Sequence, residues 1–206
     1  MIAITVSTNY SDILPFVISA NAHYFTKWLI VTDVNDEPTI SLLKTVPNVV
    51  ILYWDFKNNG SKFDKGGAIR HAQLFAYHNF PTDWYLLLDS DICLTTQFAA
   101  VFNQVNQLNI NNIYGVQRRD FHKMSDYKNG INFSVYKYEF AGQVHGYFQL
   151  YKQKLLYQPF KDASSSDVWF CNQFPITSMF NINCNHLGKS GHNWNGRELG
   201  SDFIID

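Results

Sequence analysis

The sequence predicts a single α/β domain with a mostly parallel central sheet flanked by helices. Short apolar segments alternate with helix-like segments through the first half of the chain, which is typical of βαβ units. Trp84–Leu88 is continuously apolar, as expected of a strand that is buried on both faces. A length of 206 residues, with 46% hydrophobic and 16% charged residues, fits one folded globular domain.

The first half of the chain contains the more regular elements. Ser11 or Asp12 is expected to cap the first helix, in whose first turn Pro15 is tolerated. The fourth strand ends abruptly in a polar turn. The expected strands cover residues 2–7, 28–32, 49–54 and 84–88, and the expected helices cover about 12–24 and 65–78.

The second half is less regular and forms a smaller subregion of the same domain. Residues 118–142 lack a clear periodicity and are expected to form a loop, and the Gly- and Asn-rich tail 187–206 is expected to lie over the site. The other expected elements are helices at about 97–108 and 167–174 and strands at 113–117, 146–151 and 180–186.

Composition excludes several classes of function. A net charge of −1 with no block of Lys or Arg argues against nucleic-acid binding. The three cysteines have no metal-binding spacing and are expected to be buried in a reducing compartment. The short, uncharged N-terminal strand does not resemble a signal peptide, and no stretch has the length of a membrane span. We therefore expect a soluble, cytoplasmic protein.

Polar side chains follow the buried strands where each strand ends. Asp89 and Asp91 come directly after the fourth strand, at the carboxyl edge of the sheet, where open α/β sheets bind ligands. The two carboxylates would repel each other unless a cation such as Mg²⁺ or Mn²⁺ neutralised them. The pattern predicts a metal–phosphate site. The alternative is a solvated turn in which Asp91 caps a later helix.

Two further strand ends should lie at the same edge. Thr8, Asn9 and Tyr10 follow the first strand, and Asp33 follows the second. Asp33 could accept hydrogen bonds from a base or ribose, or could be an ordinary turn residue. Tyr10 could stack on a base, or could pack in the core.

These segments together resemble the nucleotide-sugar half of a GT-A (Rossmann-like) glycosyltransferase. The resemblance lies in the order of the Thr8–Tyr10 loop, Asp33, the Lys65–Arg70 helix start and the segment 81–91, so it assigns residues 1–94 to the donor half and 95–206 to the acceptor half. It implies that Asp89 and Asp91 bind Mn²⁺ or Mg²⁺ on the donor diphosphate. It also implies that Lys65, Arg70 and Ser90 contact the donor, although Arg70 could equally be an exposed helix charge.

The late His186-Leu-Gly-Lys189 segment extends the resemblance. Many GT-A enzymes take a third metal ligand from such a histidine, so His186 is the expected ligand and His192 the alternative. Lys189 and Arg197 would then neutralise the diphosphate. The competing interpretation of His186 is a hydrogen-bonded core residue.

The acceptor half suggests a catalytic carboxylate. The Ser164–Phe170 segment resembles the one that carries the base of inverting members, so Asp167 could deprotonate an acceptor hydroxyl. Alternatively, Asp167 stabilises the first turn of a helix capped by Ser164 or Ser166. Trp169 or Trp194 could stack on the acceptor sugar.

The expected function is transfer of a hexosyl or deoxyhexosyl group from a nucleotide-diphosphate sugar, a UDP-sugar by resemblance, to a glycan or other hydroxyl acceptor. The late histidine segment resembles the retaining, glycogenin-like branch, whereas the serine-rich segment before Asp167 resembles inverting members. Three alternatives stay open: a retaining transferase, a nucleotidyltransferase, and a carbohydrate-binding protein on a degenerate glycosyltransferase fold. The small size also resembles glycosyltransferase domains of large DNA viruses, which would place the protein in a host cytoplasm.

Overall fold

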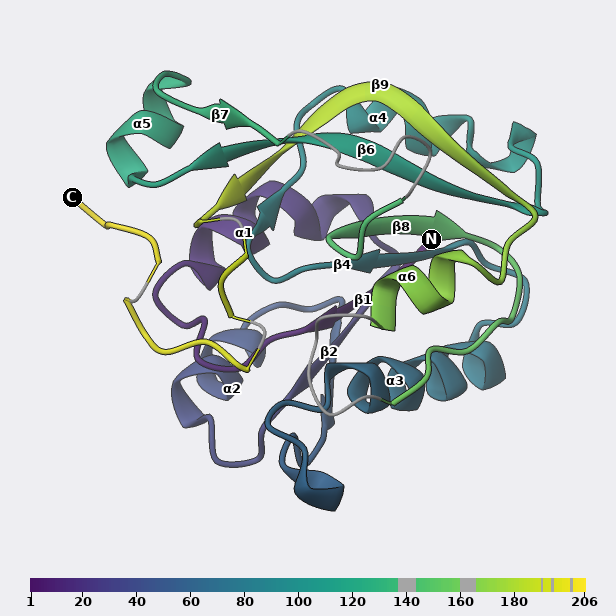
Figure 1. Ribbon diagram of the computed structural model, residues 1–206, viewed down its shortest axis with the longest axis horizontal. Helices are drawn as coiled ribbons and strands as arrows, with labels where there is room; N and C mark the ends of the chain where they lie inside the picture. The colour runs from purple at the N-terminus through teal and green to yellow at the C-terminus, as the bar shows by residue number, and fades with distance from the viewer. Residues whose placement is uncertain (137–143, 160–165, 190, 194, 201) are drawn as a thin grey trace.

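The computed structural model describes residues 1–136, 144–159, 166–189, 191–193, 195–200 and 202–206. Its centre is one nine-stranded mixed sheet in the order β3-β2-β1-β4-β8-β6-β9-β5, with β7 paired to β6 (Figure 1). The strands are β1 (Ile2–Val6), β2 (Lys27–Thr32), β3 (Val49–Tyr53), β4 (Tyr85–Leu88), β5 (Ile92–Cys93), β6 (Asn112–Phe121), β7 (Ser134–Val135), β8 (Phe148–Tyr151) and β9 (Ile176–Leu187).

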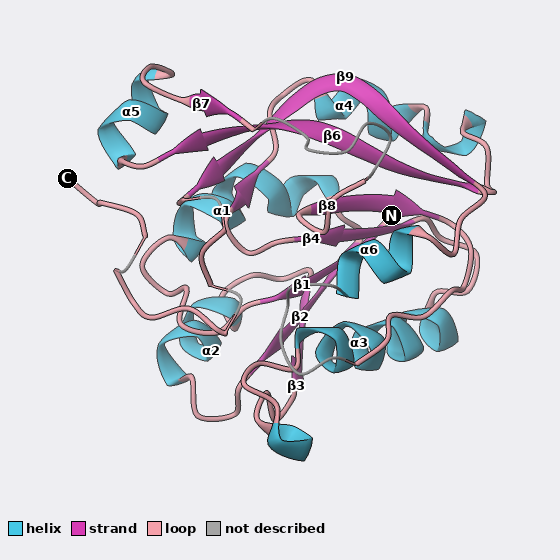
Figure 2. Ribbon diagram, viewed as in Figure 1, coloured by secondary structure: helices cyan, strands magenta, loops and turns pink. Residues whose placement is uncertain are grey.

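Helices cover both faces of the sheet (Figure 2). They are α1 (Leu14–Asn21), α2 (Glu37–Leu43), α3 (Lys65–Asn79), α4 (Phe98–Asn103), α5 (Met124–Asn129) and α6 (Ser166–Cys171). Among the described residues, no helix has the length and apolarity needed to span a membrane.

The continuous apolarity of the early strands results from burial on both faces. In β4, Leu86 and Leu88 join the core under α1 and α4, whereas Tyr85 and Leu87 join the core under α3 and α6. Successive side chains of a strand point to opposite faces, so a strand between two cores must be apolar throughout. The predicted α/β class and the four parallel strands are confirmed, since β4-β1-β2-β3 pair in parallel.

Two early elements differ from the prediction. Helix α2 was not expected; it begins after Asp36, whose side chain accepts a hydrogen bond from Thr39 N at 3.3 Å, and it has only seven residues. Helix α1 begins at Leu14 without a side-chain cap, because the Asp12 carboxylate is bound elsewhere. Short helices and local capping choices depend on tertiary partners that periodicity does not reveal.

The second half departs further from the prediction. Residues 118–142 are not simply a loop, because β6 continues to Phe121 and is followed by α5 and β7. Strand β6 runs parallel to β9 and antiparallel to β8. Arg118 and Asp120 interrupt its apolar pattern although both are buried, so the sequence pattern indicated a polar loop.

Candidate active site

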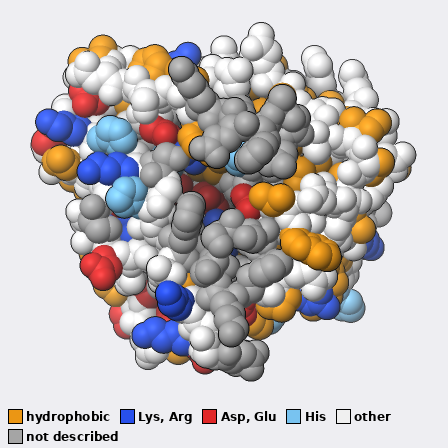
Figure 3. Space-filling view, viewed as in Figure 1, with side chains coloured by type: hydrophobic (Ala, Val, Ile, Leu, Met, Phe, Trp, Pro, Cys, Tyr) orange, Lys and Arg blue, Asp and Glu red, His pale blue; other side chains and the backbone are white. Residues whose placement is uncertain are grey.

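A cavity of about 320 Å³ opens where the carboxyl ends of β1 and β4 meet the later strands. Figure 3 shows acidic side chains lying deep in a hollow on this face. Many predicted site residues line the cavity: Tyr10, Lys65, Asp89, Ser90, Asp91, Asp167, His186, Lys189, His192 and Arg197. The structure therefore brings the early acidic turn and the late histidine to one place.

Lys65 and Asp89 form an ion pair on the floor of the cavity. Lys65 is the first residue of α3, which Asp64 caps by accepting a hydrogen bond from Gly67 N at 2.8 Å. The helix start directs Lys65 Nζ to 2.6 Å from Asp89 Oδ1. Burial lowers the pKa of Lys65, but the charge and hydrogen bond of Asp89, with the charges of Asp167 and Asp91, together raise the pKa above its usual value. The pair keeps a fixed cation beside the acidic turn.

Asp91 and His186 face each other across the β5–β9 region. His186 Nε2 lies 3.5 Å from Asp91 Oδ2, and His186 Nδ1 lies 2.9 Å from Asp120 Oδ1. All three side chains are buried. Burial opposes the charged imidazole, but the charge of Asp91 and the hydrogen bonds to both carboxylates raise the pKa of His186 to about 9. The two carboxylates thus favour the protonated form of the imidazole.

The two carboxyl groups of the acidic turn have different environments. Burial, together with the negative charges of Asp91 and Asp167, raises the pKa of Asp89 above its usual value although Lys65 opposes this shift. Burial also disfavours ionised Asp91, but His186, Arg118 and Lys65 together hold the pKa of Asp91 below its usual value. Of the two carboxyl groups, Asp91 is therefore the one whose surroundings favour the ionised form.

Asp167 lies in the same cavity, in the first turn of α6. Its Oδ2 accepts a hydrogen bond from Gly146 N at 3.0 Å, and its Oδ1 accepts one from Val168 N at 2.8 Å. A Cβ atom at position 146 would lie 2.6 Å from the Asp167 Cβ, so the close approach requires glycine. The structure thereby places a half-buried carboxylate within reach of a ligand in the cavity.

Arg197 is completely buried and its charge is matched by two carboxylates. Its guanidinium donates to both oxygens of Asp12, at 2.6 and 2.8 Å, and to Asp202 Oδ1 at 2.9 Å. It also donates to Asn9 O at 2.6 Å, and Asn9 Nδ2 donates back to Arg197 O at 2.9 Å. Its guanidinium lies 4.8 Å from the centre of the Tyr10 ring. These contacts join the C-terminal segment to the loop after β1.

A second cavity of about 440 Å³ lies beside the first. The two share Phe63 and Arg197 as lining residues. Thr8 and Asn9, predicted to bind the sugar-nucleotide donor, and Asp33, predicted to contact its base or ribose, line this second cavity rather than the first. The residues predicted to bind the sugar-nucleotide donor are thus divided between two adjoining cavities.

Other predicted residues have different surroundings. Arg70 is not a lining residue of either cavity. Its Nη1 lies 3.5 Å from Tyr157 O. Trp169 is 57% exposed on α6. Trp194 and Ser164 lie outside the described residues.

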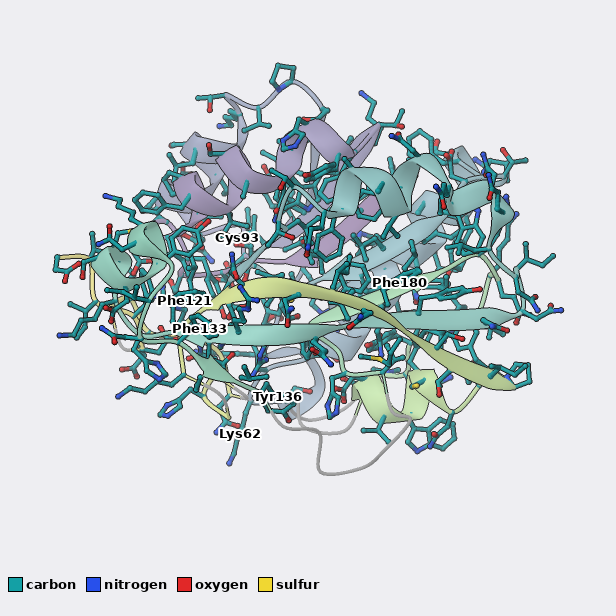
Figure 4. The ribbon with its side chains drawn as sticks, turned by 90° about the horizontal axis from the view of Figure 1, so that it is seen from above. Lys62, Cys93, Phe121, Phe133, Tyr136 and Phe180 are labelled. Atoms are coloured by element: carbon teal, nitrogen blue, oxygen red, sulfur yellow. The ribbon has the colours of Figure 1, made fainter. Side chains whose placement is uncertain are left out.

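One wall of the first cavity includes Arg118 and Tyr136, which the sequence prediction missed. Arg118, Tyr136, His145 and Tyr147 line this wall together, and Figure 4 shows Tyr136 on the α6 side of the β6 ribbon. The Arg118 guanidinium lies 4.4 Å from the centre of the Tyr136 ring and 4.7 Å from that of Tyr147. The Arg-x-Asp spacing of residues 118–120, which puts opposite charges on one face of a strand, was the available signal.

Some of the oxygen and nitrogen atoms in the site could bind a divalent metal ion such as Mn²⁺. In the described part of the chain, no three His, Cys, Asp or Glu side chains already form a metal-binding cluster. Asp91 and His186 supply one oxygen and one nitrogen that face each other, and Mn²⁺ accepts such mixed ligands. A carboxylate on the far ring nitrogen, as Asp120 provides, is typical of metal-binding histidines.

Comparisons with known proteins identify the fold. No protein-family model matches the chain, and no curated protein matches its sequence. The crystal structure of S. aureus TarS 1–349 matches with a TM-score of 0.60 and 11% identity, over 90% of this chain and 59% of that chain. The crystal structure of HddC from Yersinia pseudotuberculosis matches with a TM-score of 0.56 and 13% identity, over 90% of this chain and 92% of that chain.

These likenesses show a shared fold and nothing finer, since identity is low in both cases. The chain spans about three-fifths of the TarS fragment and nearly all of HddC. They confirm the expected Rossmann-like, GT-A-type α/β class.

Proposed function

We propose that this chain is a metal-dependent glycosyltransferase that uses a nucleoside-diphosphate sugar. One observation carries the proposal: the acidic turn after β4, the buried His186 of β9 and Asp167 of α6 line one cavity at the carboxyl edge of the sheet. Open α/β sheets bind ligands at this edge. The shared fold is consistent with this function.

The proposed donor site uses both cavities. The nucleoside would occupy the cavity lined by Thr8, Asn9 and Asp33, and the diphosphate would extend past Phe63 toward the acidic turn. Asp91 and His186 would hold the ion, with Asp89 as the third predicted ligand, although Asp89 is paired with Lys65 in this structure. Uridine as the base follows from the family resemblance.

Asp167 is proposed as the base for the acceptor. Its carboxylate would take the proton of an acceptor hydroxyl while that oxygen bonds to the anomeric carbon and the bond to the diphosphate breaks. A bound divalent ion would stabilise the negative charge of the leaving diphosphate. Lys65, and Lys189 at the rim of the cavity, would add positive charge there.

The test is turnover of UDP-sugars with Mn²⁺, measured as release of UDP to water or to a glycan acceptor. Asp91→Asn should lower turnover by at least about 100-fold, because the ion stabilises the transition state by several kcal/mol. Asp126→Asn, on α5, removes a carboxylate outside both cavities and should turn over like the wild type.

Three outcomes would contradict the proposal. One is full turnover by Asp91→Asn. Another is a folded wild-type protein that binds no sugar nucleotide with Mn²⁺ but does bind a glycan, which would favour a carbohydrate-binding protein. The third is release of pyrophosphate from a nucleoside triphosphate and a sugar phosphate, which would indicate a nucleotidyltransferase.

A further inference from the structure

Strand pairing brings a second carboxylate to the far side of His186. Strands β6 and β9 run in parallel, and Asp120 of β6 is the register partner of His186. Arg118 precedes Asp120 by two residues and therefore points to the same face of the sheet. All three side chains are buried. The pairing of β6 with β9 therefore brings Asp120 next to His186, although the two residues are far apart in sequence.

The contacts of Asp120 fix the orientation of the His186 ring. Asp120 Oδ1 lies 2.7 Å from Arg118 Nε and 2.9 Å from His186 Nδ1. Arg118 Nη2 also donates to the other carboxylate oxygen, Asp120 Oδ2, at 3.4 Å. His186 Nδ1 is thus the ring nitrogen that contacts Asp120. This leaves Nε2 directed at Asp91, 3.5 Å away.

Arg118 is itself held in place by aromatic rings. Its guanidinium contacts both Tyr136 and Tyr147, at 4.4 and 4.7 Å from the two ring centres. Tyr147 is fixed in turn, because its hydroxyl donates to Val116 O at 2.5 Å. Such cation–π contacts are strongest where water is excluded, as in this buried setting. Asp120 is therefore held between His186 on one side and a fixed Arg118 on the other.

We propose that Asp120 is a positioning residue, which holds the His186 ring so that Nε2 binds the divalent ion together with Asp91. The proposal rests on the proposed metal-dependent function. Carboxylates placed behind a metal-binding histidine orient the ring and increase its basicity, and their removal typically weakens metal binding about 10–100-fold.

The experiment measures Mn²⁺ binding without nucleotide, by electron paramagnetic resonance of the free ion. Asp120→Asn should bind Mn²⁺ about 10–100-fold more weakly than the wild type. Asp126→Asn removes a carboxylate from the next element, α5, and should bind like the wild type. In a His186→Ala background, adding Asp120→Asn should cost nothing further, because the ring that Asp120 orients is absent.

A measurement on the wild type covers the case in which Asp120→Asn fails to fold. Ring-nitrogen NMR of the Zn²⁺-loaded protein, assigned by the signals lost in His186→Ala, should show hydrogen on Nδ1 and the metal on Nε2. Metal on Nδ1 would overturn the positioning role.

The remaining outcomes separate this inference from the proposed function. If the wild type binds Mn²⁺ and Asp120→Asn binds it equally well, only the positioning role is overturned. If the folded wild type binds no Mn²⁺, the metal site and the positioning role are both overturned. Weaker binding by Asp120→Asn, with the expected Nδ1 hydrogen, supports the proposal.

Discussion

Asp167 reaches the cavity because its neighbour at position 146 is a glycine. The backbone N–H of Gly146 donates to one carboxylate oxygen, and the N–H of Val168 donates to the other. A methyl group at position 146 would overlap the Asp167 side chain. The absence of a Cβ atom at Gly146 thus allows the Asp167 carboxylate to face the cavity.

We predict that Asp167→Asn keeps donor binding but loses about 10²–10⁴-fold in transfer, the usual contribution of a general base. Gly146→Ala should also reduce transfer, because the added Cβ displaces the carboxylate. Donor affinity by calorimetry and transfer to an acceptor check both variants. Unchanged transfer in Asp167→Asn would remove Asp167 from the mechanism and favour a retaining reaction.

At the scale of elements, the C-terminal segment is fastened to the loop after β1 by a buried charge cluster. Arg197 joins Asp12 of that loop to Asp202 of the segment. Because two carboxylates already neutralise Arg197, we assign it to holding these elements together and not to binding the diphosphate. The segment thereby forms part of the boundary between the two cavities.

We predict that Arg197→Leu lowers the free energy of unfolding by about 3–5 kcal/mol, because it removes the cationic partner of the buried Asp202 and of the half-buried Asp12. Urea denaturation at pH 7 measures this loss. Leu74→Ala on α3, a 51% exposed apolar side chain, is the control and should have little effect. A loss as small as that of the control would show that the cluster contributes little to stability.

Acid should weaken the same cluster. Burial raises the pKa of Asp12, but the hydrogen bonds and charge of Arg197, with backbone hydrogen bonds, together hold the pKa below its usual value. A carboxyl group with a depressed folded-state pKa stabilises the fold above its unfolded pKa of about 4, and the stabilisation is lost as pH falls through the folded value. Asp12→Asn should therefore be less stable than the wild type at pH 7, and this difference should shrink below about pH 4. Urea titrations at both pH values test this, and a difference independent of pH would contradict it.

At the scale of the whole molecule, the sheet brings together groups that are far apart in sequence. The parallel strands β1, β2 and β4 end at one edge, and β9 returns to that edge with His186. The residues that line the two cavities at this edge include Asp33 in one and Asp167 in the other. An elongated ligand with a nucleoside at one end and a sugar at the other matches this arrangement.

We predict that one of UDP, GDP, CDP and ADP raises the melting temperature, and only when Mn²⁺ is present. At a ligand concentration about 100 times Kd, the expected shift is roughly 5–10 °C for a chain of this size. EDTA should abolish the shift. An equal shift with and without Mn²⁺ would contradict a metal–diphosphate site, and no shift with any nucleotide would contradict nucleotide binding.

The first four strands and the position of the acidic turn could be predicted from the amino-acid sequence alone. A strand such as β4 that supplies two cores must be apolar on both faces, so it is visible as a continuous run. Asp89 and Asp91 follow that run, so their place at the carboxyl edge of the sheet could be predicted.

The partners of the buried charges, in contrast, could not be predicted without the three-dimensional fold. Arg118 and Asp120 looked like loop residues because a sequence pattern treats charges as exposed, whereas folding buries them against each other and His186. Arg197 likewise looked available for a phosphate until Asp12 and Asp202 were placed beside it. Burying a charge is favourable only when a partner is present, and these partners meet through strand pairing and chain closure rather than sequence spacing.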